Sequence, residues 1–277
     1  MDNIKTLDFS GFYMRTTLDG HEHLFARPGI TLTFFLDEPL AASCNAVADL
    51  IELFISTIPR GTLRSYLAKN GYYKALTDRQ ITRDLRALRE LPQDYEGFTL
   101  DYSEGELGQV GTHGALFMAN VLSPMAPDRS NLVRLEYPEN ILEVWGEARF
   151  LQFVTDAAQC LPFSSGHAGY AFKRPAWESG SFRAVAPLLP RYLGFDPSEH
   201  WGRRWMRGHT YTTHWINLLG TQLTEKLGGL ESMQATGKHV ELRRSAMVHC
   251  LEVLVSPQSA MSTVGRTTLG NCRLSPD

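Results

Sequence analysis

The sequence predicts an α+β fold in which an antiparallel sheet packs with helices. Some segments alternate apolar and polar residues with a period of two, others repeat apolar residues at helical spacing, and no sustained β-α-β rhythm connects them. The 277 residues contain no Gly/Ser or Pro linker and no internal repeat. We therefore expect one domain over residues 1–277 with its core at about 27–255 and a loosely held Ser/Thr-rich tail at 256–277. Two associated halves that divide near residue 138 are the alternative.

The composition and the N-terminal sequence limit the class of protein. Hydrophobic residues make up 43% and charged residues 21% of the chain, which allows a sizeable core and excludes a disordered protein. The net charge of −3 argues against a nucleic-acid-binding protein that relies on a basic surface. No apolar segment has the length of a signal peptide or a membrane span, and the four cysteines are far apart. We expect a cytoplasmic protein with reduced thiols, no cofactor and no membrane partner.

Local signals place the elements of the first half in order. Residues 30–36 alternate between the two faces of a strand, as expected where one face is buried. Ser43 or Asn45 is expected to cap the helix that follows, and Pro59 ends that helix. Thr77 begins a capping box, which predicts a second helix. The first half thus starts with a strand and continues with two helices.

A β-rich region and a long helix come next. Strands are predicted at 98–102, 113–122 and 132–137, and the turn-rich connection between the last two predicts an antiparallel meander. Pro138 suits the first turn of a helix, and apolar residues continue at helical spacing over 139–161. This is the longest helix that the sequence predicts.

The second half contains shorter elements. The sequence predicts a strand at 166–172, a helical segment shortened by prolines at 182–193, helices at 215–227 and 230–235, and a final hairpin of 240–242 with 247–255. Residues 201–213 are rich in Trp and Arg. We interpret them as arginines that lie over buried tryptophans rather than as a site for single-stranded nucleic acid.

Acidic residues gather in one part of the chain. Residues 1–140 contain 19 acidic and 13 basic residues, whereas residues 141–277 contain 11 and 14. No Lys or Arg occurs between Arg89 and Arg129, so no cation nearby in the sequence neutralises the negative charge of this stretch. Its clustered acidic residues, the acidic segment, are Asp94, Glu96, Asp101, Glu104 and Glu106. They form either a solvated loop or a docking face for a basic partner.

Candidate catalytic residues are few. His21 and His23 form an H-x-H pair, which on a strand could hold a divalent metal, but Asp19-Gly20 before them predicts an exposed turn. The Ser-Ser-Gly-His sequence at 164–167 lacks the glycines of a nucleophile elbow. The sequence therefore predicts neither a metal site nor an active site. A metal-dependent hydrolase that uses His21 and His23 is the alternative.

Four short motifs in the second half resemble a known family. They are Leu-Pro-Phe-Ser-Ser-Gly-His-Ala-Gly-Tyr-Ala-Phe at 161–172, Tyr-Leu-Gly-Phe-Asp at 192–196, His-Trp-Ile-Asn-Leu-Leu-Gly at 214–220 and Leu-Gly-Gly-Leu at 227–230. Their order and spacing resemble the TsiV-like family of type VI secretion immunity proteins. The resemblance spans roughly residues 27–255 and is weaker before residue 138. Thr212-Thr213-His214 stands where the family pattern often has Gly-Val-Asn.

The resemblance implies a bacterial protein that is encoded beside a secreted toxin and binds that toxin instead of catalysing a reaction. We expect five residues of the motifs to have structural roles. Two are aromatic residues that anchor the core, and three are glycines at close-packing or turn positions. They are Phe163, Gly166, Gly169, Trp215 and Gly220. The family therefore supplies a function without a catalytic residue.

The residues and the resemblance together predict an immunity protein that neutralises a cognate effector toxin in the cytoplasm. Because no signal peptide is predicted, we expect a toxin with a cytoplasmic target such as nucleic acid or a nucleotide cofactor. A nuclease usually has a basic cleft, which would fit the acidic segment, and electrostatic steering would speed association. Blocking of the toxin's own assembly is an equally available mechanism that needs no acidic face. A homodimer is compatible with either mechanism, and an interaction scaffold unrelated to toxins is a third hypothesis.

Overall fold

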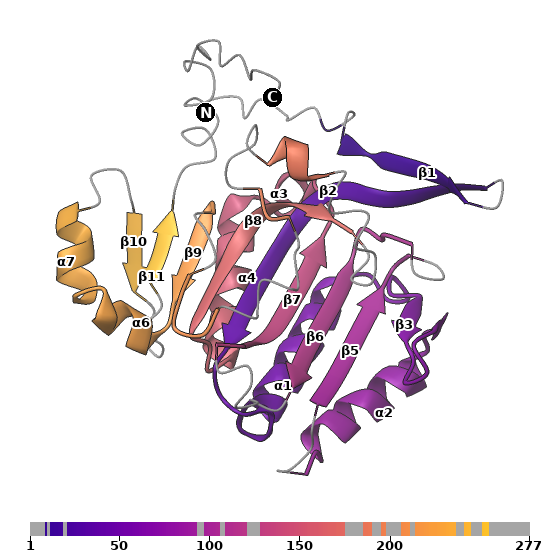
Figure 1. The fold of residues 1–277 in the computed structure, drawn as a ribbon, viewed down its shortest axis with the longest axis horizontal. Coiled ribbons are helices and arrows are strands. Elements are labelled where there is room, and N and C mark those ends of the chain that lie inside the picture. Colours follow the sequence, from indigo (N-terminus) through magenta and orange to yellow (C-terminus); the bar gives the residue numbers. More distant parts are fainter. Residues whose placement is uncertain are drawn as a thin grey trace, which may run out of the picture.

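One sheet of eleven strands forms the scaffold of the described part of the chain (Figure 1). The computed structural model describes residues 9, 12–18, 21–92, 97–105, 109–120, 128–174, 185–189, 195–197, 206–210, 214–236, 241–244 and 251–254. The strands are β1 (Met14–Leu18), β2 (His21–Leu36), β3 (Ser65–Leu67), β4 (Tyr73–Ala75), β5 (Gly97–Ser103), β6 (Gly114–Asn120), β7 (Asn131–Tyr137), β8 (Ser165–Lys173), β9 (Ile216–Leu219), β10 (Glu241–Arg244) and β11 (Leu251–Leu254). They follow the order β10-β11-β9-β8-β2-β7-β6-β5-β3-β4, and β1 pairs with β2 outside this path.

Strand β2 is the longest strand and lies in the middle of the sheet. It has 16 residues and pairs antiparallel with β7 on one side and with β8 on the other. Four side chains of one face are fully buried: Ile30, Leu32, Phe34 and Leu36. The strand predicted at 30–36 is confirmed, but β2 begins earlier because its first residues pair with β1.

Helices complete the α+β fold that the sequence predicts, and the fold class is confirmed. The helices are α1 (Leu40–Thr57), α2 (Asp78–Arg89), α3 (Ile141–Trp145), α4 (Glu147–Cys160), α6 (Thr221–Lys226) and α7 (Gly229–Thr236). Among the described residues, no helix is long and apolar enough to cross a membrane.

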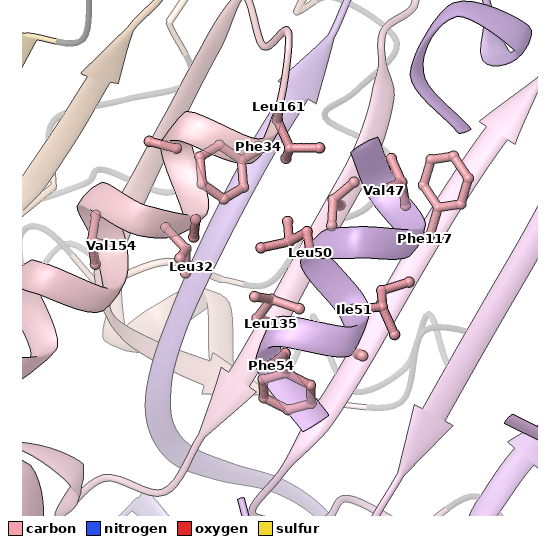
Figure 2. Packing of buried hydrophobic residues seen from close by; sticks show 14 of the residues in the cluster. Leu32, Phe34, Val47, Leu50, Ile51, Phe54, Phe117, Leu135, Val154 and Leu161 are labelled. Carbon is pink, nitrogen blue, oxygen red and sulfur yellow. The ribbon is translucent and has the colours of Figure 1, made fainter. Parts of the chain in front are cut away.

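The main core lies between the sheet and the helices α1 and α4, which pack beside each other behind the central strands in Figure 1. In Figure 2, Leu50 and Phe54 of α1 and Val154 of α4 lie over Leu32 of β2 and Leu135 of β7. Full burial of a Leu or Phe side chain stabilises a fold by about 1.5–3 kcal/mol. This layer therefore fixes the helices to the central strands.

The two helices of the first half begin in different ways. α1 begins directly after Pro39, which has φ −55° and ψ 149°, and no side chain caps this helix. The prediction that Ser43 or Asn45 caps it is wrong, because the fixed φ of proline starts the helix earlier and leaves both residues inside it. α2 begins after Thr77, whose hydroxyl accepts a hydrogen bond from Gln80 N at 3.2 Å, as the capping box predicts.

The predicted meander is present, but the predicted long helix is interrupted. β5, β6 and β7 pair as successive antiparallel neighbours. The helical pattern over 139–161 forms two helices, α3 and α4, on either side of Gly146. Gly146 has φ +78°, a left-handed conformation that ends α3 and that glycine adopts without steric cost. The prediction of a single helix is wrong because the apolar periodicity continues through this one residue.

The helix predicted at 215–227 is wrong in its first part. Residues Ile216–Leu219 form β9, which pairs with β8 and β11, and α6 begins only at Thr221. A short apolar run followed by a glycine fits a buried strand and a buried helix equally well, so its pattern does not separate the two. The helix at 230–235 and the final hairpin are confirmed as α7 and as β10 with β11.

Some predicted segments lie mostly outside the described residues. Of the helical segment at 182–193, the described part contains a 3-10 turn at Ala186–Leu188. Of the irregular stretch at 201–213, only residues 206–210 are described. The tail at 256–277 lies outside them entirely.

The face of the sheet opposite α1 and α4 carries polar and charged side chains, and we call it the polar face. Because side chains alternate along a strand, the residues next to those of the main core point to this face. They include Thr31, Asp101, Arg134, Glu136, His167 and Lys173. A small apolar cluster of Phe35, Leu116, Leu132 and Met206 lies beside them.

We expect Gly220→Ala to destabilise the fold more than Gly146→Ala. A Cβ at Gly220 would lie 2.8 Å from the carbonyl oxygen of Ser164 and even closer to that of Phe163, so the backbone would have to move. A Cβ at Gly146 would have nothing within 4 Å, so only its left-handed backbone opposes the change. Urea denaturation should show losses of about 3 kcal/mol or more for Gly220→Ala and about 1–2 kcal/mol for Gly146→Ala, whose φ of +78° and ψ of 152° suit glycine. Equal losses would contradict the close packing at Gly220.

Candidate functional site

The structure divides the five residues of the acidic segment. Asp101 lies on β5 and Glu104 follows that strand, whereas Asp94, Glu96 and Glu106 lie outside the described residues. Both described carboxylates accept hydrogen bonds from their own chain. These two residues therefore do not belong to a freely solvated loop.

Asp101 is held on the polar face by a tyrosine of β4. Tyr73 Oη donates a hydrogen bond to Asp101 Oδ2 at 2.6 Å. Burial raises the pKa of Asp101, the hydrogen bond from Tyr73 lowers it and the charge of Glu136 raises it, which leaves the pKa at about 6. A cavity of about 40 Å³ beside these groups is also lined by Arg134 and Arg174. It has room for a few water molecules and not for an organic ligand.

Glu104 closes the connection between β5 and β6, which we call loop 104–113. Its Oε2 accepts hydrogen bonds from Thr112 N at 2.8 Å, from His113 N at 3.2 Å and from the Thr112 hydroxyl. The backbone N–H of Glu104 also donates to His113 O at 2.9 Å. Because 30% of the Glu104 side chain remains exposed, a partner can still reach its carboxylate.

A buried lysine of β8 anchors loop 104–113. Lys173 Nζ donates to Gly111 O at 2.9 Å and to Thr112 O. Burial lowers the pKa of Lys173 to about 8, although the charge of Glu136 opposes this shift. Because a buried ammonium group without acceptors is costly, the lysine and the loop carbonyls stabilise each other. Sequence reasoning missed Lys173, since no local pattern signals a hydrogen bond to so distant a segment.

A second buried ionic group lies at the centre of the polar face. His167 Nε2 lies 2.9 Å from Asp196 Oδ2, and the Thr31 hydroxyl donates to the same oxygen at 3.3 Å. The ring of His214 stacks on that of His167 with 3.9 Å between centroids. Burial alone would raise the pKa of Asp196, but attraction to His167, Arg134 and His214 holds it well below its usual value. All five side chains are at most 4% exposed, so the group is structural and out of reach of a substrate.

His21 and His23 belong to strand β2, so the prediction that they lie in an exposed turn is wrong. His21 pairs with Leu18 and His23 with Thr16 of β1, because the chain reverses before His21. The side chains of both histidines lie outside the described residues. Among the side chains that the structure does describe, no group of three or more His, Cys, Asp or Glu residues is placed to hold a metal ion. No described feature thus favours a metal-dependent hydrolase.

The residues of the family motifs lie around β8 and β9. Phe163 and Trp215 are part of the main core, where both side chains are buried. Gly166 and Gly169 belong to β8, and Gly220 directly follows β9. All five residues therefore lie in the core, in a strand of the sheet or directly after one, where they contribute to packing.

Comparison with known proteins identifies the family. Residues 50–246 match the TsiV family, which is described as type VI immunity for VRR-NUC. The fold is similar to that of the Pseudomonas aeruginosa T6SS (type VI secretion system) protein PA0821, with a TM-score of 0.68 and 16% identity over 88% of this chain and 74% of that chain. No curated protein matches the sequence. Because the family match covers well over half of the residues, the chain belongs to the TsiV family of type VI immunity proteins.

Proposed function

We propose that this immunity protein binds a VRR-NUC effector, a nuclease delivered by type VI secretion, and neutralises it in the cytoplasm. The match to the type VI immunity family for VRR-NUC is the observation that carries the proposal. Such a protein acts by binding its partner and catalyses no reaction, so its effect depends on the free energy of binding. Nanomolar affinity corresponds to about −12 kcal/mol and commonly needs an interface of about 800 Å² on each partner.

The acidic segment is the proposed partner-binding surface. A nuclease needs cationic side chains to hold the phosphates of its substrate, so acidic side chains fit its cleft and steer association. Asp94, Glu96 and Glu106 supply the charge, and the exposed part of Glu104 adds to it. The hydrogen bonds of Glu104 and Lys173 order the described parts of loop 104–113 before the partner arrives, which lowers the entropy cost of binding.

Two mechanisms of neutralisation follow from such binding. Occlusion places the immunity protein in the cleft that holds the substrate, so the effector cannot bind DNA and the immunity protein at once. A block of effector assembly needs no contact with the cleft, so DNA and the immunity protein bind independently. Competition between a DNA duplex and the immunity protein for the effector therefore separates the two mechanisms.

Co-expression tests the proposed function directly. Cells that express the VRR-NUC effector encoded beside the gene for this chain should stop growing, and co-expression of this chain should restore their growth. The two purified proteins should elute together in size-exclusion chromatography, and DNA cleavage should stop near an equimolar ratio. The same effector with an unrelated immunity protein is the control. Persistent growth arrest at equal expression would show that the proposed function is wrong.

Charge reversal tests the acidic segment. The triple variant Asp94→Lys, Glu96→Lys, Glu106→Lys should associate about tenfold more slowly with the effector at low salt, and high salt should shrink the difference. Stopped-flow or surface plasmon resonance measures the association rate. The control reverses three exposed acidic residues elsewhere, so that the change in net charge is the same: Glu143→Lys, Glu147→Lys and Glu231→Lys. Equal association rates for both variants would remove the acidic segment from the interface.

Asp101→Asn should alter the pH dependence of stability. The pKa of Asp101 is raised from 3.8 to about 6, so the folded state holds this proton more tightly and the wild type loses stability as the pH rises through this range. Asn cannot ionise, and its oxygen still accepts a bond from Tyr73. Relative to the wild type, the variant should gain about 1–3 kcal/mol between about pH 4 and pH 7.5, as measured by urea denaturation. A difference that does not change with pH would contradict the raised pKa.

A further inference from the structure

The surface around α2 is basic although the half of the chain that contains it is acidic. Residues 60–90 contain eight basic and three acidic residues, a net charge of +5, whereas residues 1–140 carry a net charge of −6. The basic residues are Arg60, Arg64, Lys69, Lys74, Arg79, Arg83, Arg86 and Arg89. All of them except Arg89 are exposed.

Arg89 has a role within the fold. Its guanidinium group pairs with Asp49 at 2.7 Å and with Glu52 at 2.9 Å, both on α1. These ion pairs join α2 to α1 and explain why this position is an arginine. They do not explain the other three arginines of α2.

Arg79, Arg83 and Arg86 form a row along α2, which we call the arginine stripe. At 3.6 residues per turn they lie within about 60° of one another around the helix, on the side away from the buried Leu85 and Leu88. No ion pair joins them to any acidic residue that the structure describes. Like charges three or four residues apart destabilise an isolated helix by about 0.2–0.5 kcal/mol per pair. Arg86 lies in the last turn, where a cation favours the helix dipole, and Arg83 donates to Gln80. These contacts do not require three neighbouring arginines on an exposed face, which points to a role outside the fold.

The arginine stripe borders an apolar groove. A hollow of about 400 Å³ lies between α1 and α2, and Ile55, Ile81 and Leu85 contribute apolar side chains to its lining. Arg86 and Arg89 line the same groove. An apolar centre with a charged rim is the usual anatomy of a protein–protein interface.

The hairpin of β3 and β4 extends the basic surface. Lys69 and Lys74 are exposed on this hairpin, and between them Tyr72 is 72% exposed, more than any other large hydrophobic side chain among the described residues. Arg60 pairs with Asp78 at 2.5 Å, which ties the chain before the hairpin to the start of α2. Tyr and Arg are, with Trp, the residues that are enriched at binding hot spots.

We propose that the arginine stripe, together with the apolar groove and the basic hairpin, is a second contact surface for the effector and binds a carboxylate-rich face of that protein. This inference rests on the proposed function and adds a surface to it. Guanidinium groups bind carboxylates through paired, charge-assisted hydrogen bonds. A partner that fills the apolar groove beside them would displace its water, which strengthens such bonds.

The distribution of charge favours a protein partner over a nucleic acid. Asp78, Asp84 and Glu90 lie among the basic residues, and Asp94 of the acidic segment follows shortly after α2. A phosphate backbone carries only negative charge and offers nothing to the carboxylates of this surface, whereas a protein face of mixed charge can match both signs. The basic hairpin also lies beside the described start of loop 104–113, because β3 pairs with β5 and Ser65 donates a hydrogen bond to Gly105 O.

A charge-reversal titration tests this inference on the full chain. The probe is a catalytically inactive form of the VRR-NUC effector encoded beside the gene, and isothermal titration calorimetry measures the Kd. The stripe variant is Arg79→Glu, Arg83→Glu, Arg86→Glu. The control variant, Arg149→Glu, Arg207→Glu, Lys226→Glu, reverses three exposed cations elsewhere and has the same net charge. The Kd should rise about 10- to 100-fold for the stripe variant and less than about threefold for the control.

The outcomes separate this inference from the proposed function. If the wild type binds the effector and the stripe variant binds as tightly as the control, the inference is wrong and the proposed function stands. If the wild type does not bind the effector, the proposed function is wrong and the inference with it. Circular dichroism checks the fold, and the milder Arg79→Gln, Arg83→Gln, Arg86→Gln variant replaces the stripe variant if the latter is unfolded. Loss of binding to a labelled DNA duplex with unchanged effector affinity would assign the stripe to nucleic acid and overturn the inference.

Discussion

The structure depends on the burial of both faces of β2. The even-numbered side chains from residue 30 to residue 36 of this strand lie in the main core, where apolar contact stabilises them. Thr31 and Thr33 point to the polar face and need partners, because a buried hydroxyl without a hydrogen bond costs about 1–3 kcal/mol. Thr31 donates to Asp196, and Arg134 Nε donates to the Thr33 hydroxyl. Since Asp196 also pairs with His167, polar groups from four distant segments join in one network under the central strand.

The same polar face reaches the proposed partner-binding loop through Lys173. The lysine crosses β2 at Gly29, where a Cβ atom would come within 2.7 Å of Lys173 Cδ. Glycine at that position therefore leaves the path open for the side chain to reach Gly111 and Thr112. The position of Gly111 and Thr112 is thus set by the central sheet and not by the loop alone. A binding surface built in this way is ordered before its partner arrives.

Local physics made part of this fold predictable from the sequence. The alternation at 30–36 and the capping box at Thr77 are complete within a few residues, and the structure shows both. The features that the sequence did not predict depend either on the conformation of a single residue or on contacts with segments that are distant in the sequence. Gly146 divides a helix whose periodicity continues, and β9 is a strand because β8 and β11 lie beside it. Lys173 donates a hydrogen bond to a loop that is distant in the sequence. The basic residues around α2 are not evident from the net charge of residues 1–140, which is negative.

A surface with both signs of charge would let an immunity protein bind quickly and still discriminate. A purely acidic surface attracts basic proteins in general. The long-range attraction depends on the summed charge of the surface and hardly on the positions of the individual side chains. Beside the acidic segment, the arginine stripe would repel a uniformly basic partner, and this repulsion adds to specificity. In the proposed complex the acidic segment acts on the association rate, and the stripe with its groove acts on the dissociation rate. In this proposal the arrangement of the two charges selects the effector, and the pairing of β3 with β5 holds the basic hairpin beside the strand that leads to Glu104.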